Sequence, residues 1–444
     1  MLSVAGAKTW VELDRALRAT TCFGSATAPP NGPTPDEGLS RLVTACSWDG
    51  RQRESAVASL TDESLLPVLV LRTADWVPQV RERARRSLAT AFRSASAPGL
   101  LSAVSMAVAI GSWARGGPAL DAATAALAAA PDEMLASARG HSDLGVRRLA
   151  YRLWLASGRC RDEEVMRAAL DEPDGISRLR CAEWLASGGA SRVDVLERLL
   201  SQGSAMVGVE ALTALVKLGR PEAGVAHLTD RSALMRATAQ WAARRAGRSP
   251  AAIYREALTA NRPRARALVA GLGECGTGQD VDVLLPYLEH PSPRVRAEAV
   301  RAVRRLGGPM TQITGMLADP APVVVRAVKQ ALRHEPDAVP AERLWPLLAA
   351  DSPPHVRLGA YDQLREKGSW TRVHVDLHLL AASDPELSTR ARADLTDWIH
   401  HNAATTYRPP AEPMVLRLRQ LIDTAEPVIG PHQAGQLRWF LNTG

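Results

Sequence analysis

Aromatic residues, lysine and closely spaced cysteines are all scarce in this sequence of 444 residues. Phe, Tyr and Trp together account for 4% of it. Ala and Leu dominate the apolar residues, which favours helices, because strands need more aromatic and β-branched side chains. The cysteines are far apart and include no Cys-x-x-Cys motif, which argues against a disulfide framework or a zinc knuckle; they are Cys22, Cys46, Cys160, Cys181 and Cys275. The composition therefore predicts an all-α protein with reduced thiols.

Long apolar runs are also absent. The stretch that starts at Leu65 is broken by Pro67 and closed by Arg72, well short of the roughly 18 apolar residues of a membrane-spanning helix. Residues 1–20 carry several charged side chains, beginning with Lys8, where a secretory signal would have its apolar core. We therefore expect a cytoplasmic protein with no membrane insertion.

A unit of about 30 residues recurs through the middle of the chain. Its clearest copy begins at His290 and reads His-Pro-Ser-Pro-Arg-Val-Arg-Ala-Glu-Ala-Val. The first apolar residues of successive copies are Val146, Ile176, Val207, Met235, Ala265, Val295, Val324 and Val356. A fixed period of this length is the signature of a solenoid, in which each unit packs only on its neighbours.

Glycine and aspartate recur at fixed places in this unit. Glycines twelve residues after the start can take the left-handed conformation that ends a helix; they are Gly158, Gly188, Gly219, Gly247, Gly307 and Gly368. Aspartates five residues before the start can cap the following helix; they are Asp171, Asp230, Asp319 and Asp351. Runs such as residues 281–288 are long enough for another helix. The pattern predicts an α-solenoid of about 11–12 antiparallel helix pairs.

Pro293, Val295, Arg296, Ala299 and the pair Leu306-Gly307 resemble the HEAT-repeat family, in particular the short bacterial form called PBS-lyase HEAT-like repeats. The likeness covers about three quarters of the chain. We expect an N-terminal helix at 1–20, a flexible Pro/Gly-rich connection at 21–38, a repeat array at 39–401 that is clearest over 143–368, and a linker with C-terminal capping helices at 402–444.

An arginine recurs directly after the first apolar residue of many copies. The resemblance implies that this arginine lies beside the aspartate of the interhelix turn and ties adjacent units together. The arginines with this structural role would be Arg81, Arg147, Arg236, Arg266, Arg296 and Arg357, with Asp230, Asp319 and Asp351 as turn aspartates.

Charge is uneven along the chain, whose formal net charge is +7. Between Asp230 and Arg333 we count 17 basic and 8 acidic residues, a surplus of nine. Helical spacing places several of these side chains opposite the buried stripe, and the resemblance implies that this face lines a concave groove. The candidate partner-binding residues are Trp241, Arg245, Arg294, Arg301 and Arg305. The alternative is that Trp241 packs on a neighbouring helix while the arginines are solvated.

Other residues carry weaker signals. Trp154 and Trp184, each in a Trp-Leu-Ala-Ser-Gly sequence, should be core residues. His374 and His378 lie one helical turn apart, but a zinc site needs a third ligand within reach. The sequence has no HExxH motif, Gly-rich phosphate loop or GxSxG motif. We therefore predict no catalytic residues, no metal and no cofactor.

The sequence is consistent with two functions. The first is a non-enzymatic scaffold or adaptor that binds a protein partner on its curved surface, the role that the repeat pattern favours. The alternative is a nucleic-acid-binding protein, remotely similar to HEAT-like DNA glycosylases, that uses a basic concave groove. The positive charge supports this alternative. A chromophore-lyase role has no support beyond the shared repeat.

Overall fold

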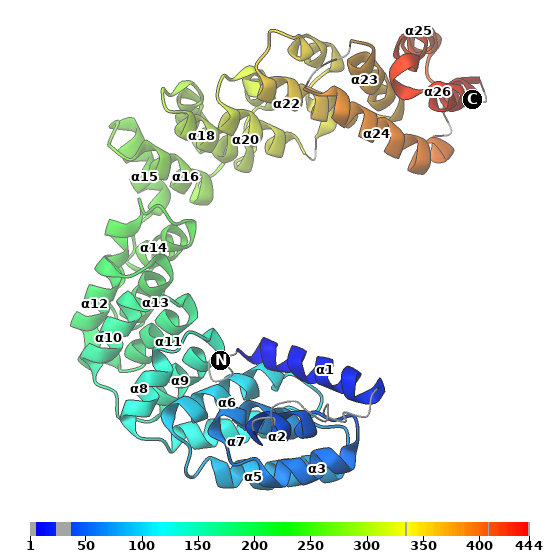
Figure 1. The fold of residues 1–444 in the computed structure, drawn as a ribbon. Coiled ribbons are helices and arrows are strands. Elements are labelled where there is room, and N and C mark those ends of the chain that lie inside the picture. The colour runs from blue at the N-terminus through cyan, green and yellow to red at the C-terminus, as the bar shows by residue number, and fades with distance from the viewer. Residues whose placement is uncertain are drawn as a thin grey trace. The chain divides into compact units, whose positions relative to one another are not determined.

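The computed structural model describes residues 6–23, 37–333, 335–382, 384, 386–406 and 408–442, and over these residues the protein is all-α with no strand. Antiparallel helix pairs stack one after another, which is the arrangement of an α-solenoid (Figure 1). Most of the predicted connection at 21–38 lies outside the described residues. Among the described helices, none is long and apolar enough to cross a bilayer.

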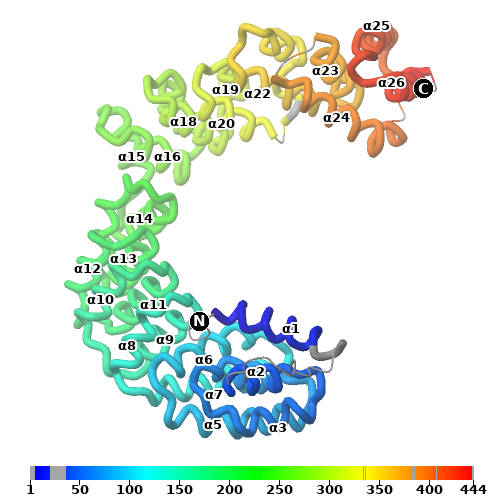
Figure 2. The backbone as a smooth tube through the Cα atoms, viewed as in Figure 1, coloured from blue at the N-terminus to red at the C-terminus, as the bar shows by residue number. Residues whose placement is uncertain are grey.

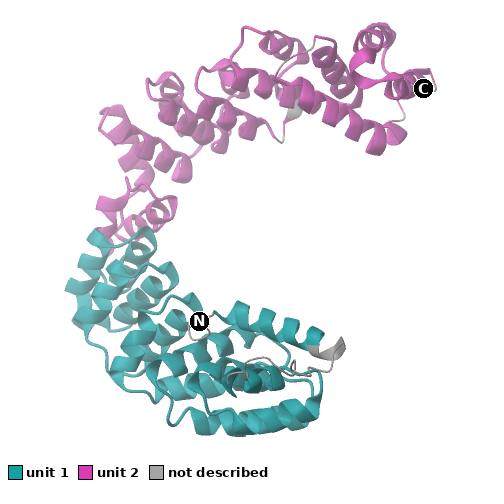
Figure 3. Cartoon of the chain, in the orientation of Figure 1, with its two compact units in different colours: residues 1–220 teal, residues 221–444 magenta. Residues whose placement is uncertain are grey.

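The chain divides into two compact units, residues 1–220 and 221–444 (Figure 3). Unit 1 begins with α1 (Ala7–Phe23). The first helices of its pairs are α2 (Glu37–Ala45), α4 (Leu66–Arg72), α6 (Ala97–Ile110), α8 (Asp132–Arg139), α10 (Asp162–Asp171) and α12 (Val193–Gln202). The second helices are α3 (Gly50–Ser59), α5 (Pro78–Ala91), α7 (Gly117–Ala128), α9 (Leu144–Ala156), α11 (Gly175–Ala186) and α13 (Ala205–Lys217).

Unit 2 has the same organisation. Its first helices are η4 (Pro221–His227), α15 (Pro250–Thr259), α17 with η6 (Val281–Leu284 and Leu285–Glu289), α19 with η7 (Met310–Gly315 and Met316–Ala318), α21 with η9 (Ala341–Leu344 and Trp345–Leu348), α23 (Ser369–Ala381) and α25 (Glu412–Ile429). The second helices are α14 (Ala233–Arg245), α16 (Ala265–Cys275), α18 (Pro293–Arg305), α20 (Pro322–Leu332), α22 (Pro354–Arg365), α24 (Ser388–His401) and α26 (Pro431–Asn442).

The core of each unit lies between the helices of a pair and between successive second helices. Helix α18 shows why: Val295, Ala299 and Val303 are buried along one stripe, whereas Arg294 and Arg305 are exposed on the opposite side. A helix with this pattern can bury its apolar stripe only against other helices, and α16 and α20 pack on its two sides. Burial of each such valine contributes about 1.5–3 kcal/mol of transfer free energy.

Proline shapes the first helices of unit 2. The run at 281–288 forms a short α-helix and then continues as the 3-10 helix η6, because Pro286 has no N–H to donate to the preceding turn. Pro346 in η9 repeats this arrangement. These first helices are therefore shorter and tighter than the sequence pattern alone predicts.

Glycines end many of the second helices. Gly219, Gly247 and Gly307 have φ values of 81°, 70° and 76°, and the residue after Gly307 returns a hydrogen bond from its N–H to the carbonyl of Val303. One predicted position differs, because Gly188 follows the end of α11 with a right-handed φ of −76°. Its neighbour Gly189 takes the left-handed conformation instead, at φ 66°.

The turn before α16 departs from the other repeats. Asn261 and Arg264 have φ values of 49° and 70°, uncommon for residues with a Cβ. Arg264 is the N-cap, so Ala265 is only the first residue of α16 and the buried stripe begins at Leu268. Within α16, a Cβ on Gly271 would lie 2.2 Å from the ring of Tyr254, so the glycine allows Tyr254 to pack directly on the helix backbone.

Helix α1 packs on α4 and α6 of unit 1, and Figure 2 shows it next to α6. Trp10 is buried in this contact at 2% exposure. Ion pairs hold the helix in place: Asp14 pairs with Arg72 at 2.5 Å, and Arg18 pairs with Asp75 at 3.3 Å. Two further helices, α25 and α26, pack against each other at the C-terminal end of unit 2.

Candidate functional site

The repeated arginine of the interhelix turn divides its hydrogen bonds between two repeats. Arg296 shows the arrangement: its Nη1 donates to the carbonyls of His290 and Pro291 in its own turn, at 3.0 and 3.2 Å. Its Nε and Nη2 donate to the two carboxylate oxygens of Asp319 in the next repeat, both at 2.8 Å. One guanidinium therefore closes a turn and joins it to its neighbour.

The same geometry recurs with different carboxylates. Arg236 bonds the carbonyl of Asp230 at 2.8 Å and pairs with Glu274. Arg147 pairs with Glu172. The partners come from the next repeat in each case, and only in the Arg296 pair is the partner a turn aspartate that the sequence singles out.

We call the arginines that bond the interhelix turns framework arginines. The other three predicted members of this set depart from the geometry of Arg296. Arg357 pairs with Asp384 and with Glu386, the latter at 3.2 Å. Arg81 bonds only the two carbonyls of its own turn, at 2.8 and 3.0 Å. Arg266 differs from all of them, because its side chain is 60% exposed and its ion pair is with Glu298 of α18, at 3.7 Å. The late start of α16 moves Arg266 out of the turn register.

Two further arginines bond groups of an interhelix turn without a place in the predicted set: Arg178 bonds only its own turn, and Arg53 also reaches a carboxylate of the next repeat. Arg178 donates to the carbonyls of Glu172 and Pro173, and Arg53 donates to the carboxylate oxygens of Asp75, both at 2.9 Å. Arg178 lies two residues after the predicted start of its copy, so the signal that identifies it is its distance from the N-cap, Asp174.

The turn aspartates lie before the N-cap rather than at it. Oδ1 of Asp230 accepts the N–H of Ser232 at 2.8 Å, and Oδ1 of Asp319 accepts the N–H of Ala321 at 2.8 Å. Ser232 and Ala321 are the N-caps of α14 and α20. Asp351 is exposed in the turn before α22, whose N-cap is Pro353. These aspartates shape the turn, and other residues begin the helix.

The buried pair of Arg53 and Asp75 in unit 1 shows how strongly the arginine stabilises the charged form of its carboxylate partner. Burial alone would raise the pKa of Asp75, but hydrogen bonds from Arg53 and from the N–H of Val77 outweigh it and hold the pKa below the usual value. The side chains of Arg53 and Asp75 are both fully buried. The charge of Arg53 is therefore neutralised inside the protein.

The five predicted partner-binding residues occupy two helices with α16 between them. Trp241, 38% exposed, and the exposed Arg245 lie one turn apart on α14. Arg294 and Arg305 are exposed on α18. Arg301, on the same face of α18, is half-buried and pairs with Glu298 at 2.9 Å. These side chains are therefore on the second-helix face of unit 2, and Arg301 has part of its charge neutralised.

A basic hollow lies further along this second-helix face and is lined by residues from α20, α22 and α24 and by Arg333 at the end of α20. It has a volume of about 740 Å³. Five basic side chains line it: Arg326, Lys329, Arg333, Arg365 and Arg390. Lys329 pairs with Asp362 and Arg365 pairs with Asp394. Arg326, Arg333 and Arg390 are exposed and form no ion pair within the described part of the chain.

The sequence did not single out these three arginines as a group. The charge surplus up to Arg333 includes Arg326 and Arg333, and it is the only signal that points toward them. Arg390 belongs to a helix two repeats further on, so no window along the sequence joins it to the others.

Below the basic hollow lies a buried network of charged groups. Asp394 accepts hydrogen bonds from Arg365 at 2.6 Å and from Arg372 at 2.8 Å. Asp376 is fully buried beside it and accepts a hydrogen bond from the hydroxyl of Tyr361 at 2.7 Å. Burial raises the pKa of Asp376 to about 9, so this carboxyl is protonated at neutral pH.

The histidines on either side of Asp376 form an aromatic cluster. The rings of His374 and His378 lie 4.5 and 5.4 Å from that of Trp345, measured between centroids. Burial lowers the pKa of His374 to about 4, so the ring is neutral. Among the described residues no group of three or more metal-ligating side chains comes together.

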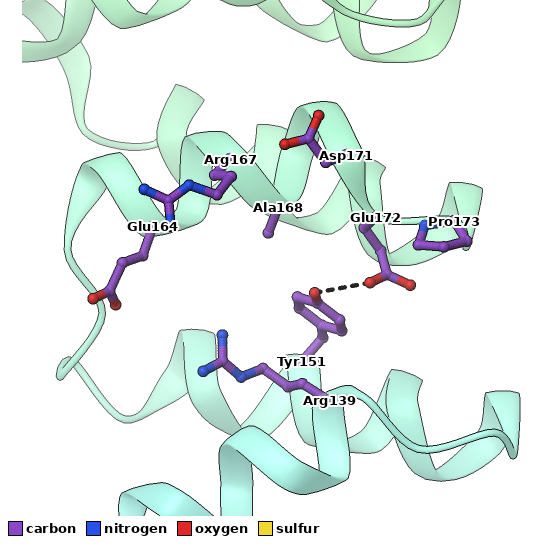
Figure 4. Close-up of a pocket in the computed structure, with 8 residues that line it drawn as sticks. All are labelled: Arg139, Tyr151, Glu164, Arg167, Ala168, Asp171, Glu172 and Pro173. Carbon is purple, nitrogen blue, oxygen red and sulfur yellow. Dashed lines mark hydrogen bonds between the residues drawn. The ribbon is translucent and has the colours of Figure 1, made fainter.

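A second hollow, of about 440 Å³, lies in unit 1 between α8, α9 and α10 (Figure 4). Arg139 and Arg167 reach toward it from α8 and α10. On its opposite side the hydroxyl of Tyr151 donates to Glu172 at 2.9 Å. We call this the Arg139 pocket.

A family model described as HEAT repeats matches residues 252–333 and 281–365. The matched range runs from α15 to the end of α22, so it includes the Arg296 framework site and part of the basic hollow. This part of unit 2 therefore consists of HEAT repeats. Curated protein sequences include no match to the chain.

Solved structures with a similar chain path include a crystal structure of importin beta in an ammonium sulfate condition. It covers 98% of this chain and 69% of its own, with 12% identity and a TM-score of 0.38. Kap121p bound to Ste12p covers 99% of this chain and 47% of its own, with 12% identity and a TM-score of 0.27. Kap121p bound to Nup53p covers 99% of this chain and 48% of its own, with 12% identity and a TM-score of 0.27. The chain spans about half the length of Kap121p.

Proposed function

We propose that this chain is a non-enzymatic scaffold that binds an acidic segment of a protein partner on the second-helix face of unit 2. The basic hollow carries the proposal. Its exposed arginines have no carboxylate partner in the described chain, whereas the framework arginines of the same unit are paired. Exposed positive charge that the fold does not need for its own turns is available to an acidic ligand.

The form of the repeats supports the same proposal. Successive second helices from α14 to α22 pack on one another, so a linear segment can contact several repeats at once. The period of about 30 residues also supports assigning these repeats to the short bacterial form that the sequence resembles. Trp241 and Arg245 on α14 would extend the contact surface beyond the hollow.

Nucleic acid is the second candidate ligand, and the exposed Trp241 beside Arg245 is the observation that favours it. An indole on a basic face can stack on a base. Acidic groups argue against a continuous phosphate backbone, since Asp362 and Glu366 line the basic hollow and Glu298 lies among the arginines of α18. A peptide can place its carboxylates between such groups, and a regular run of phosphates cannot.

Charge reversal at the basic hollow tests the proposal. The variant is Arg326→Glu/Arg333→Glu/Arg390→Glu in the full chain, and the probe is a fluorescent Asp/Glu-rich peptide. We expect at least about tenfold weaker peptide binding, because opposite charges that attracted the ligand now repel it. The matched control, Arg51→Glu/Arg83→Glu/Arg86→Glu, changes three exposed arginines of unit 1 and should bind as the unmodified chain does.

Equal peptide binding by the two triple variants would remove the basic hollow as the site. Duplex and single-stranded DNA form the second arm of the experiment. DNA binding that is tighter than peptide binding and falls steeply with salt would replace the protein-partner proposal with the nucleic-acid one.

A further inference from the structure

The Arg139 pocket contains an arginine whose charge the protein leaves without a counter-ion. The guanidinium of Arg139 lies over the indole of Trp154, with Cζ 3.9 Å from the ring centroid. Its Nε is buried and has no hydrogen-bond partner, and its side chain forms no ion pair with a described residue. Trp154 is only 5% exposed, so the arginine covers it. The guanidinium edge faces the hollow (Figure 4).

The next repeat contains the same stack with its counter-ion in place. Trp184 begins the second Trp-Leu-Ala-Ser-Gly sequence and is only half-buried, less than the sequence predicts. Arg192 lies over its ring at 4.0 Å. The Nε of Arg192 donates to Asp162 at 2.8 Å, and its Nη1 donates to the carbonyl of Trp184 at 2.9 Å. The arginine on Trp184 is satisfied by the chain, and the arginine on Trp154 is not.

Most acidic groups around the Arg139 pocket are already occupied. Glu172 accepts from the hydroxyl of Tyr151 at 2.9 Å and pairs with Arg147. Glu164 pairs with Arg161 at 2.5 Å. Neither carboxylate reaches Arg139, so neither neutralises it.

The remaining charges indicate what kind of ligand the pocket can hold. Arg139 and Arg167 are both without an ion pair in the described chain, and Asp171, also without one, is exposed at the rim. Two positive charges and one negative charge leave one positive charge to be balanced. A singly charged anion matches this surplus, and a doubly charged phosphate exceeds it. The guanidinium edge suits a carboxylate, which it can bind with two parallel hydrogen bonds.

We propose that the Arg139 pocket binds the carboxylate of a small carboxylic acid or of a peptide C-terminus. The carboxylate lies against the edge of Arg139, and the ring of Tyr151 and the side chains of Ala168 and Pro173 contact the apolar part of the ligand. A volume of about 440 Å³ suits a small ligand or one terminal residue. This site is in unit 1 and is independent of the function proposed for unit 2.

Ligand-observed NMR on the full chain tests the proposal with four probes: N-acetyl-leucine, N-acetyl-leucinamide, acetate and inorganic phosphate. We expect N-acetyl-leucine to bind and its amide, which has no carboxylate, not to bind. Binding of N-acetyl-leucine well above that of acetate assigns the pocket to peptide ends, and similar binding of the two assigns it to small acids. Absence of binding by both acids, equal binding of the acid and the amide, or tighter binding of phosphate would overturn the proposal.

Two variants and one control locate the binding. Arg139→Gln and Arg167→Gln should each weaken binding of N-acetyl-leucine by about tenfold or more, since each removes a charge that faces the ligand. Arg167 is exposed, so its variant keeps the test valid if Arg139→Gln does not fold. The control Arg192→Gln disrupts the satisfied stack on Trp184 and should leave binding unchanged. Equal weakening by Arg192→Gln, or full binding by both pocket variants, would refute the assignment.

Discussion

The arginines of the interhelix turns and those of the basic hollow have the same chemistry in different surroundings. Arg53 and Arg296 each donate to carbonyls of their own turn and to a carboxylate of the next repeat. Arg326, Arg333 and Arg390 project from second helices into a hollow and have no counter-ion in the described chain. An excess of arginine therefore indicates a ligand-binding surface only after the arginines that are paired with carboxylates of the chain itself have been excluded.

Among the substitutions that test this comparison, removal of Arg53 should change the free energy of unfolding the most. Arg53 and Asp75 are fully buried, so Arg53→Met leaves the carboxylate without its main partner and should lower the free energy of unfolding by about 3–5 kcal/mol. Urea unfolding of the full chain, followed by circular dichroism, measures the loss. The control is Arg51→Met on the same helix, where the side chain is exposed and the change should stay within about 0.5 kcal/mol.

A second change at the same place separates charge from packing. Without Arg53, the buried carboxylate of Asp75 keeps only the longer ion pairs with Arg72 and Arg18, at 3.2 and 3.3 Å. If the cost comes from this poorly paired buried carboxylate, Arg53→Met/Asp75→Leu should recover part of the stability lost in Arg53→Met. Additive losses in the double variant would show that hydrogen bonds to the turn carbonyls, rather than the ion pair, dominate the role of Arg53.

The buried carboxyl of Asp376, in the charged network next to the basic hollow, should make the stability of the protein depend on pH. Asp376 is protonated in the folded protein because burial raises its pKa from 3.8 to about 9. Its contribution to stability is therefore fully present below the unfolded pKa and is lost as pH rises through the interval up to about 9. Asp376→Asn removes this dependence, so its stability relative to the unmodified chain should grow by up to about 1.4 kcal/mol per pH unit.

The matched control for this pH series has the opposite sign. At Asp280 burial would raise the pKa, but the hydrogen bond from Arg255 outweighs burial and lowers it. Its contribution is present above the unfolded pKa and is lost only in acid. Thermal unfolding between about pH 6 and pH 9 should therefore show a constant difference for Asp280→Asn and a growing one for Asp376→Asn. A constant difference for both variants would mean that Asp376 is ionised in the fold.

The repeat could be predicted from the sequence because its signals are local. Val295, Ala299 and Gly307 mark one helix and its end, and each acts within its own helix or against the neighbouring pair. Identifying the carboxylate partner of each arginine requires the packing of the next repeat. Arg236 pairs with Glu274, near the end of the following second helix, at a place where the sequence pattern has no fixed acidic position.

Two kinds of feature lay beyond the sequence. The first is a local change in the turn, as at Asn261 and Arg264, whose left-handed conformations delay α16 and take Arg266 out of the framework. The second is an assembly across repeats. The basic hollow brings Arg326 and Arg390 together from helices two repeats apart, and the Arg139 pocket depends on which carboxylates are already paired. Neither follows from periodicity.

The smallest expected effect compares an ion pair of the framework with one in the basic hollow. Arg296 and Asp319 form two parallel hydrogen bonds with side chains only 14% and 7% exposed, so a double-mutant cycle with Arg296→Ala and Asp319→Ala should give a coupling energy of about 1–2 kcal/mol. Lys329 and Asp362 are 28% and 22% exposed, and lysine offers no planar fork, so their coupling should stay below about 1 kcal/mol. We expect the coupling energy of Arg296 with Asp319 to exceed that of Lys329 with Asp362. The opposite order would mean that charged groups of the basic hollow stabilise the fold, which would contradict the assignment of the hollow to ligand binding.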